Sequence, residues 1–155
     1  SRRQRQMCIR DRISSGSNDL LHLIQLDLNM EEMIKRDAHK FDEACVQFAK
    51  TFPKIIREIR AVNPDVKIYA DNIYNPAKGI DAFSQVYSVA DVYINRMNRG
   101  FYPSDEYVLV DIKKCFDGEK ESMVNLSFKG REIDPHPSEK GHKKIAQMVI
   151  KAMER

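Results

Sequence analysis

The apolar positions of this 155-residue chain fall into short continuous runs that alternate with longer segments of three- and four-residue spacing. Two of the runs, VKIYADNIY at 66–74 and YVLVDI at 107–112, are rich in β-branched and aromatic residues. The end of a third strand is predicted at 13–15. Continuous apolar runs of this length are typical of strands that are buried on both faces, as in a parallel sheet.

Apolar residues three or four positions apart predict that the segments between and after these strands are helices. Residues 30–49 place apolar side chains three or four positions apart, and Pro53 suits the first turn of a second helical piece. Residues 80–99 have the same spacing. A last helix is predicted over 139–154 after Ser138, a favourable N-cap. The apolar stripe of this helix carries His142, Ile145, Ala146, Val149 and Met153.

The order strand, helix, strand, helix, strand, helix predicts an α/β fold, because parallel strands are joined by right-handed helical crossovers. In open α/β sheets, ligands bind at the carboxyl ends of the strands. Three turn segments follow the predicted strands: GSND at 16–19, NIYNP at 72–76 and DIKK at 111–114. The sequence therefore predicts a site at this rim, and Asn72 could line its cleft or simply end the strand.

The first twelve residues, SRRQRQMCIRDR, show no apolar periodicity. They resemble the translation of a sequencing adapter, so residues 1–12 are predicted to be non-native and residues 13–155 to be one domain or part of one. The alternative is a natural basic arm that binds nucleic acid. Without the five arginines and one aspartate of this segment, the totals of 26 basic and 23 acidic residues become 21 and 22, a net charge of −1. The remaining chain gives no electrostatic reason to expect nucleic acid as a partner.

The segment IDPHPSEKGH at 133–142 holds a histidine between two prolines. Pro135 fixes its own φ, and Pro137 favours an extended conformation at His136. Such a stiff tether suits a general base, since a displacement of about 1 Å can cost ~100-fold in rate. Asp134 is near enough to orient one ring nitrogen and leave the other to accept a proton. The alternative is a surface histidine in a proline-bearing turn that only begins a helix.

The segment GSND follows the first predicted strand. Gly16 allows the backbone to turn tightly there. The side-chain amide of Asn18 could donate an N–H to a developing oxyanion. The alternative for this segment is an Asx-turn that caps the next element.

Taken together and in this order, SSGSNDL at 14–20, NIYNP at 72–76 and DPHPSEKGHKKIA at 134–146 resemble the SGNH/GDSL hydrolase family, in particular its bacterial GDSL-type acylhydrolases. The resemblance covers residues 13–155. It implies the C-terminal part of a flavodoxin-like, three-layer α/β/α domain with a parallel sheet. It also implies an esterase or lipase activity that proceeds through an acyl-serine intermediate.

The resemblance implies a role for each block. His136 would be the general base, and Asp134 would be the carboxylate that orients it. Asn18 would donate its amide to the oxyanion, and Gly16 would shape that turn.

The chain departs from the family pattern in two ways. The family's acid stands three residues before the histidine, where this chain has Ile133, so Glu132 or Asp111 could take the place of Asp134. The block with the nucleophilic serine should precede GSND, and neither it nor the next, glycine-bearing block is present. We therefore expect a fragment that lacks the nucleophile and is inactive alone. In the flavodoxin-like strand order 2-1-3-4-5, the strand that ends at 13–15 would have a free edge.

The sequence also limits the partners. No cluster has metal-ligand spacing, so neither a metal nor another cofactor is expected. No run reaches the ~18 apolar residues of a transmembrane segment. The expected substrate is a small-molecule, lipid or carbohydrate ester, while its acyl and alcohol groups, the oligomeric state and the localisation are left open. The alternatives are a non-catalytic flavodoxin-like binding module and a pseudoenzyme, and a G-D-S block in the upstream sequence would favour the hydrolase.

Overall fold

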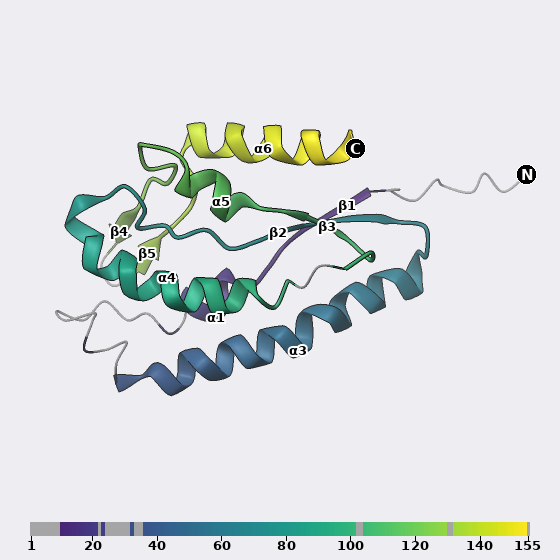
Figure 1. Ribbon diagram of the computed structural model, residues 1–155, viewed down its shortest axis with the longest axis horizontal. Coiled ribbons are helices and arrows are strands. Elements are labelled where there is room, and N and C mark those ends of the chain that lie inside the picture. The colour runs from purple at the N-terminus through teal and green to yellow at the C-terminus, as the bar shows by residue number, and fades with distance from the viewer. Residues whose placement is uncertain are drawn as a thin grey trace, which may run out of the picture.

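The computed structural model describes residues 10–21, 23, 32, 36–101, 104–129 and 132–154. Figure 1 shows a small parallel sheet with helices on either side and a hairpin beyond its carboxyl end. The described elements are β1 (Arg10–Ser14), α1 (Ser17–Leu21), α3 (Ala38–Val62), β2 (Lys67–Asp71), η1 (Asp81–Phe83), α4 (Ser84–Asn98), β3 (Val108–Val110), α5 (Ile112–Asp117), β4 (Ser127–Lys129), β5 (Glu132–Asp134) and α6 (Glu139–Met153).

The sheet has the order β1-β2-β3, and both of its strand pairs are parallel. The register pairs Ser14 of β1 with Asp71 of β2, and Asp71 in turn with Val110 of β3. All residues of β2 after Lys67 are buried, which accounts for its continuous apolar run. The structure confirms the predicted α/β class with a parallel sheet, although β2 and β3 are shorter than the predicted strands.

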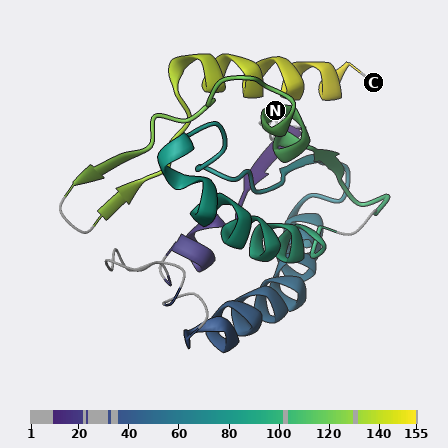
Figure 2. The same cartoon turned by 60° about the vertical axis from the view of Figure 1, so that its left-hand side comes forward.

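Successive residues of β2 face two separate apolar cores. Ile68 and Ala70 pack with α3 and α4, whereas Tyr69 packs with α5 and α6. Neighbouring side chains of a strand point to opposite faces, so this one strand contributes to both layers. Figure 2 shows α6 on one side of the sheet and α3 with α4 on the other.

The two helical pieces predicted around Pro53 form one helix, α3. A proline inside a helix costs about 3 kcal/mol or more. Phe48, Phe52 and Ile56 are buried on both sides of it, and each such side chain contributes about 1.5–3 kcal/mol. Because this burial outweighs the cost, the predicted break was wrong. The first part of the predicted helix, over residues 30–35, lies almost wholly outside the described residues. Although α3 is long, no helix in the described ranges is long and apolar enough to cross a membrane.

The sequence pattern does not predict α5 or the hairpin of β4 and β5. α5 begins after Asp111, whose carboxylate accepts a hydrogen bond from the N–H of Lys114 at 3.1 Å. This cap ends β3 where the apolar run was expected to continue as a strand. β4 and β5 pair in antiparallel fashion within a segment that was expected to be a loop. Elements this short contain too few residues for an apolar period to be recognised.

β1 starts at Arg10. This residue lies within the segment 1–12, which was predicted from the sequence to be non-native and separate from the folded domain. Arg12 forms an ion pair with Asp71, the last residue of β2. Burial raises the pKa of the Asp71 carboxyl group, and the hydrogen bond and charge of Arg12 act against this rise. Residues 10–12 thus take part in the sheet, while the non-native origin of residues 1–12 stays a prediction.

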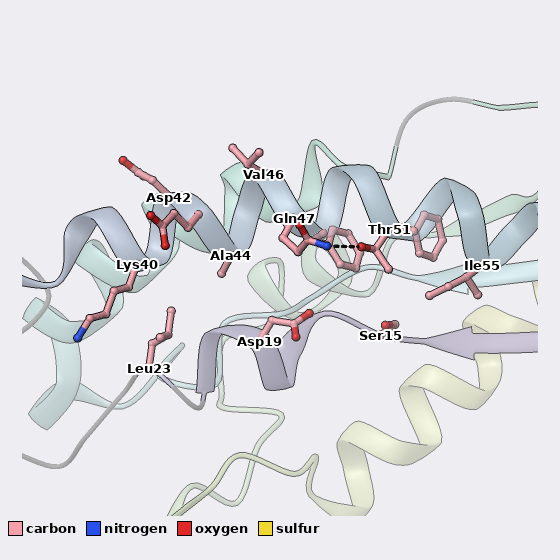
Figure 3. A pocket seen from close by; sticks show the side chains of 13 residues that line it. Ser15, Asp19, Leu23, Lys40, Asp42, Ala44, Val46, Gln47, Thr51 and Ile55 are labelled. Atoms are coloured by element: carbon pink, nitrogen blue, oxygen red, sulfur yellow. Dashed lines mark hydrogen bonds between the residues drawn. The ribbon is translucent and has the colours of Figure 1, made fainter.

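Among the described strands, β1 pairs only with β2 and therefore forms one edge of the sheet. Beside it, a groove of about 1040 Å³ runs between α3 and the segment that follows β1. Figure 3 shows Ser15 and Asp19 on one wall and Gln47 and Thr51 on the other, with a hydrogen bond of 3.1 Å from Gln47 to Thr51. Phe48 and Phe52 also line the groove. An edge strand next to apolar surface is a site where chains associate.

We expect the 155-residue chain to associate in solution, because the unpaired edge of β1 can pair with another chain. The net stability of a domain is only about 5–15 kcal/mol, which gives little protection against such association. Light scattering should show concentration-dependent oligomers or aggregates, and the thermal transition should be broad. A longer protein that carried the two further βαβ units implied by the family resemblance, about 60–80 residues, should be a monomer. A sharp, cooperative transition of a monomeric 155-residue chain would contradict this expectation.

Candidate active site

His136 lies in the loop between β5 and α6, at the carboxyl end of the parallel sheet (Figure 1). Its ring Nδ1 contacts Oδ1 of Asp134, and the same oxygen accepts the backbone N–H of His136 at 3.0 Å. The side-chain hydrogen bond, followed by the backbone one, lowers the pKa of Asp134. The carboxylate is therefore charged at neutral pH and stabilises the tautomer with the proton on Nδ1. This leaves Nε2 as the basic nitrogen of the ring.

The two-residue spacing of this pair also has a local structural meaning. A carboxylate that accepts the N–H two residues ahead forms an Asx-turn. The side chains of Asp134 and His136 are 57% and 80% exposed, respectively, so water screens their attraction. The pair alone therefore does not fix the ring, and its placement depends on how the backbone of the loop is held.

Backbone hydrogen bonds tie the loop to residues 123–125. Asn125 donates its N–H to the carbonyl of His136 at 3.2 Å, and Ser138 donates its N–H to the carbonyl of Met123 at 2.8 Å. The side chain of Ser138 accepts the N–H of Gly141 at 3.1 Å, which confirms the predicted N-cap of α6. The histidine loop is thus anchored at both His136 and the start of the helix.

Gly141 is required for this anchoring. A Cβ atom at Gly141 would lie 2.1 Å from the carbonyl oxygen of Met123, which no side chain can tolerate. From the sequence alone, a glycine in a helix indicates only weaker helix formation. The close contact was therefore not predicted.

The same packing corrects the expected place of His142. α6 buries Gly141, Ile145 and Val149, at a spacing of four. His142 follows Gly141 by one residue, about 100° around the helix, and is exposed. Its predicted position on the buried stripe was wrong.

The segment after β1 brings Gly16 and Asn18 to the same end of the sheet (Figure 1). Gly16 has a φ of 98°, and a Cβ there would lie 2.8 Å from the Phe48 ring, so the turn requires glycine. Asn18 is exposed on α1. Among the described residues, no hydrogen bond joins Asn18 to His136. Their segments lie at the same end of the sheet, and whether the two side chains share a cleft stays a prediction.

Asn72 joins the ends of β2 and β3. Its side-chain N–H donates to Asp111 at 2.7 Å, and its oxygen accepts the N–H of Lys113 at 2.9 Å. Asp111, an alternative acid for the histidine, therefore already accepts hydrogen bonds from the side chain of Asn72 and from the backbone N–H of Lys114. The side chain of Glu132, the other alternative, lies outside the described part. A place for Asn72 in the cleft stays a prediction.

A buried ion network lies behind this rim. Lys113 is 8% exposed and forms ion pairs with Asp91 at 2.9 Å and Asp117 at 2.6 Å. Burial lowers the pKa of the Lys113 ammonium group, but the bonds to the two carboxylates outweigh this and raise it overall. The network thus links α5, which carries Lys113 and Asp117, to Asp91 of α4.

Of the serines near this loop, Ser127 is exposed and lies opposite Asp134 in the β4–β5 hairpin, whereas Ser122 and Ser138 use their hydroxyl groups locally. Ser138 donates to the carbonyl of Met123 at 3.1 Å, and Ser122 donates to that of Val124 at 3.1 Å. No serine of the described part is hydrogen-bonded to His136. The groove beside α3 is lined neither by His136 nor by Asp134. In the described ranges, no three His, Cys, Asp or Glu side chains lie where they could hold a metal ion.

Comparison with known proteins supports the fold. No protein-family model matches the chain. It is 24% identical over 141 residues to the uncharacterised protein YpmR of Bacillus subtilis strain 168, which covers 90% of this chain and 52% of YpmR. It superposes with a TM-score of 0.65 on the crystal structure of the lipase Lip_vut3 from a goat rumen metagenome, at 22% identity, covering 92% of this chain and 63% of the lipase. The chain thus has a lipase-like α/β fold and spans about half the length of its curated relative.

We expect Gly141→Ala to lower the free energy of unfolding by about 1–3 kcal/mol, as overpacking does, because the methyl group would push α6 away from Met123. Gly118→Ala is the matched control. There the nearest atoms to a Cβ lie at 3.5 Å, and the helical φ of −77° suits alanine. The control should be neutral or stabilising by about 0.4–1 kcal/mol. Urea denaturation of both variants would check this, and equal effects would show that the close contact has no consequence.

Proposed function

We propose that this chain is the part of an SGNH/GDSL-type ester hydrolase that carries the general base, its orienting acid and one oxyanion donor. The observation that carries the proposal is the contact of Asp134 with Nδ1 of His136, on a loop anchored at the carboxyl end of the sheet. The lipase-like fold supports it, because such sites lie at this end of α/β sheets.

In the proposed mechanism, Nε2 of His136 takes the proton from a serine hydroxyl as the serine oxygen attacks the ester carbonyl carbon. Asp134 holds the proton on Nδ1 and stabilises the imidazolium that forms. Asn18 donates its amide N–H to the oxyanion, and Gly16 shapes the turn that presents it. His136 then gives the proton to the leaving alcohol oxygen, and water hydrolyses the acyl-serine by the same route.

The nucleophilic serine would come from a segment outside these 155 residues, which together with this chain forms what we call the parent protein. Two observations support this part of the proposal. Ser122 and Ser138 donate their hydroxyl groups to backbone carbonyls, and the comparison proteins are longer than this chain. The substrate would be an ester of a lipid, a carbohydrate or a small acyl group, bound without a metal or cofactor.

A second candidate function is a non-catalytic binding module or a pseudoenzyme. The observation that favours it is the Asx-turn between Asp134 and His136, which would form equally well in a surface loop. A parent protein with no serine block upstream, or one that does not hydrolyse p-nitrophenyl acetate faster than its His136→Ala variant, would support this second candidate.

We expect graded losses of activity in the parent protein. His136→Ala should lower kcat by about 10³-fold or more, because the serine loses its base. Asp134→Asn should lower kcat by roughly 10²- to 10⁴-fold through the wrong ring tautomer. Asn18→Ala should cost about 10²- to 10³-fold, as the loss of one oxyanion donor does. Steady-state hydrolysis of p-nitrophenyl esters measures all three.

The matched control for these variants is His142→Ala, since His142 is an exposed histidine at the start of the same helix. It should leave kcat and KM unchanged. An equal loss at His142 and His136 would show that the assignment of the base is wrong.

We also expect the 155-residue chain to lack a reactive serine. A fluorophosphonate probe, which labels activated serines, should label the parent protein and leave the chain unlabelled at equal concentration. Labelling of the chain, sensitive to His136→Ala, would show that the nucleophile lies within these residues.

A further inference from the structure

The phenol of Tyr74 connects the histidine loop to the sheet. Its hydroxyl donates to the carbonyl of Pro135, the residue before His136, at 2.8 Å. Its ring packs on Phe116 of α5, with the ring centres 4.9 Å apart. One side chain thus reaches from the end of β2 to the backbone beside the imidazole.

The segment that carries Tyr74 is itself held on both sides. The N–H of Ile73 donates to the side chain of Asn98 at 2.9 Å, and that side chain donates back to the carbonyl of Ile73 at 2.8 Å. Asn75 is 1% exposed, and its amide donates to the carbonyl of Tyr87 at 3.1 Å. Tyr74 therefore projects from a backbone that α4 fixes before and after it.

The side chain of His136 is exposed, and within the described part of the chain its ring bonds only to the exposed carboxylate of Asp134. Its position is set by the backbone at residues 135–138. The carbonyl of Pro135 bonds to Tyr74, and the carbonyl of His136 bonds to Asn125. Loss of either bond would free one of the two backbone carbonyls beside the ring.

We propose that Tyr74 is a positioning residue for His136, which it holds in register for proton transfer through the carbonyl of Pro135. This inference rests on the proposed function, since it deepens the account of the same site. Tyr74 would touch neither the substrate nor the reacting atoms.

The electrostatics of the phenol agree with this role. Burial, followed by the negative charge of Asp134, raises the pKa of Tyr74 to about 12. The hydroxyl therefore stays protonated, and so remains a donor, at any pH where an esterase would be assayed. The 2.8 Å hydrogen bond to the carbonyl of Pro135 places the hydroxyl beside the residue that lies between Asp134 and His136.

The test is Tyr74→Phe in the parent protein, which keeps the ring on Phe116 and removes only the hydroxyl. We expect kcat for p-nitrophenyl esters to fall by about 10- to 100-fold with KM changed by less than about two-fold, because a displaced base affects the chemical step. We also expect the amide hydrogen of His136 to exchange faster with solvent. The matched control is Tyr93→Phe, which changes a half-buried tyrosine of α4 that packs on Phe41 away from the loop.

The two readouts separate this inference from the proposed function. If the parent protein hydrolyses no ester, the proposed function fails, and amide exchange at His136 still decides whether Tyr74 holds the loop. Unchanged exchange together with an unchanged kcat would overturn the inference. So would equal losses in Tyr74→Phe and Tyr93→Phe that follow a common loss of stability. If Tyr74→Phe does not fold, Phe116→Leu, which loosens the ring and keeps the hydroxyl, should show the same pattern to a smaller degree, and its absence would also overturn the inference.

Discussion

The structure depends on how the chain is held where it leaves the central strand. Directly after β2, Asn72 bonds to the start of α5, the backbone of Ile73 bonds to Asn98 of α4, and Tyr74 bonds to the histidine loop. Asn75, which is buried, donates its side-chain amide to the carbonyl of Tyr87 in α4. A buried polar group is costly unless its bonds are made, so this run specifies one arrangement of the surrounding elements. Four consecutive residues at the carboxyl rim thus each bond to a different partner.

The apolar pattern was sufficient to predict the α/β class and the elements that bury whole stripes. β2 could be predicted because it buries a continuous run of residues, and the C-terminal helix because it buries residues four positions apart. α5 and the β4–β5 hairpin could not, since a helix defined by the Asp111 cap and strands of a few residues carry no measurable period. The break expected at Pro53 failed for the opposite reason, because tertiary burial of Phe48 and Phe52 overrode a local rule.

The candidate site shows the same division between local and long-range information. The flanking prolines and the nearby aspartate of His136 are visible in the sequence, as is the need for a glycine at position 16. The supports from Tyr74 and Met123 are not, because they join residues that are distant along the chain. Gly141 shows this most clearly, since the approach of the Met123 carbonyl explains why α6 has a glycine at this position.

The exposure of the Asp134–His136 pair is the feature that the proposed function has to account for. An exposed pair is screened by water, whereas a general base works best where water is excluded and its partner is fixed. In the proposed parent protein, the segment that brings the serine would also cover this rim and the free edge of β1. The open edge, the groove beside α3 and the exposed histidine would then share one cause.

The most direct test of this account is a crystal structure of the parent protein with a phosphonate bound covalently to its nucleophile. The account predicts that Nε2 of His136 lies within about 2.6–3.2 Å of the phosphonylated serine oxygen or the leaving-group position. It also predicts that the Asn18 amide donates to the phosphonate oxygen. A structure in which the phosphonylated serine is paired with another base, and His136 still faces solvent in its Asx-turn, would contradict it.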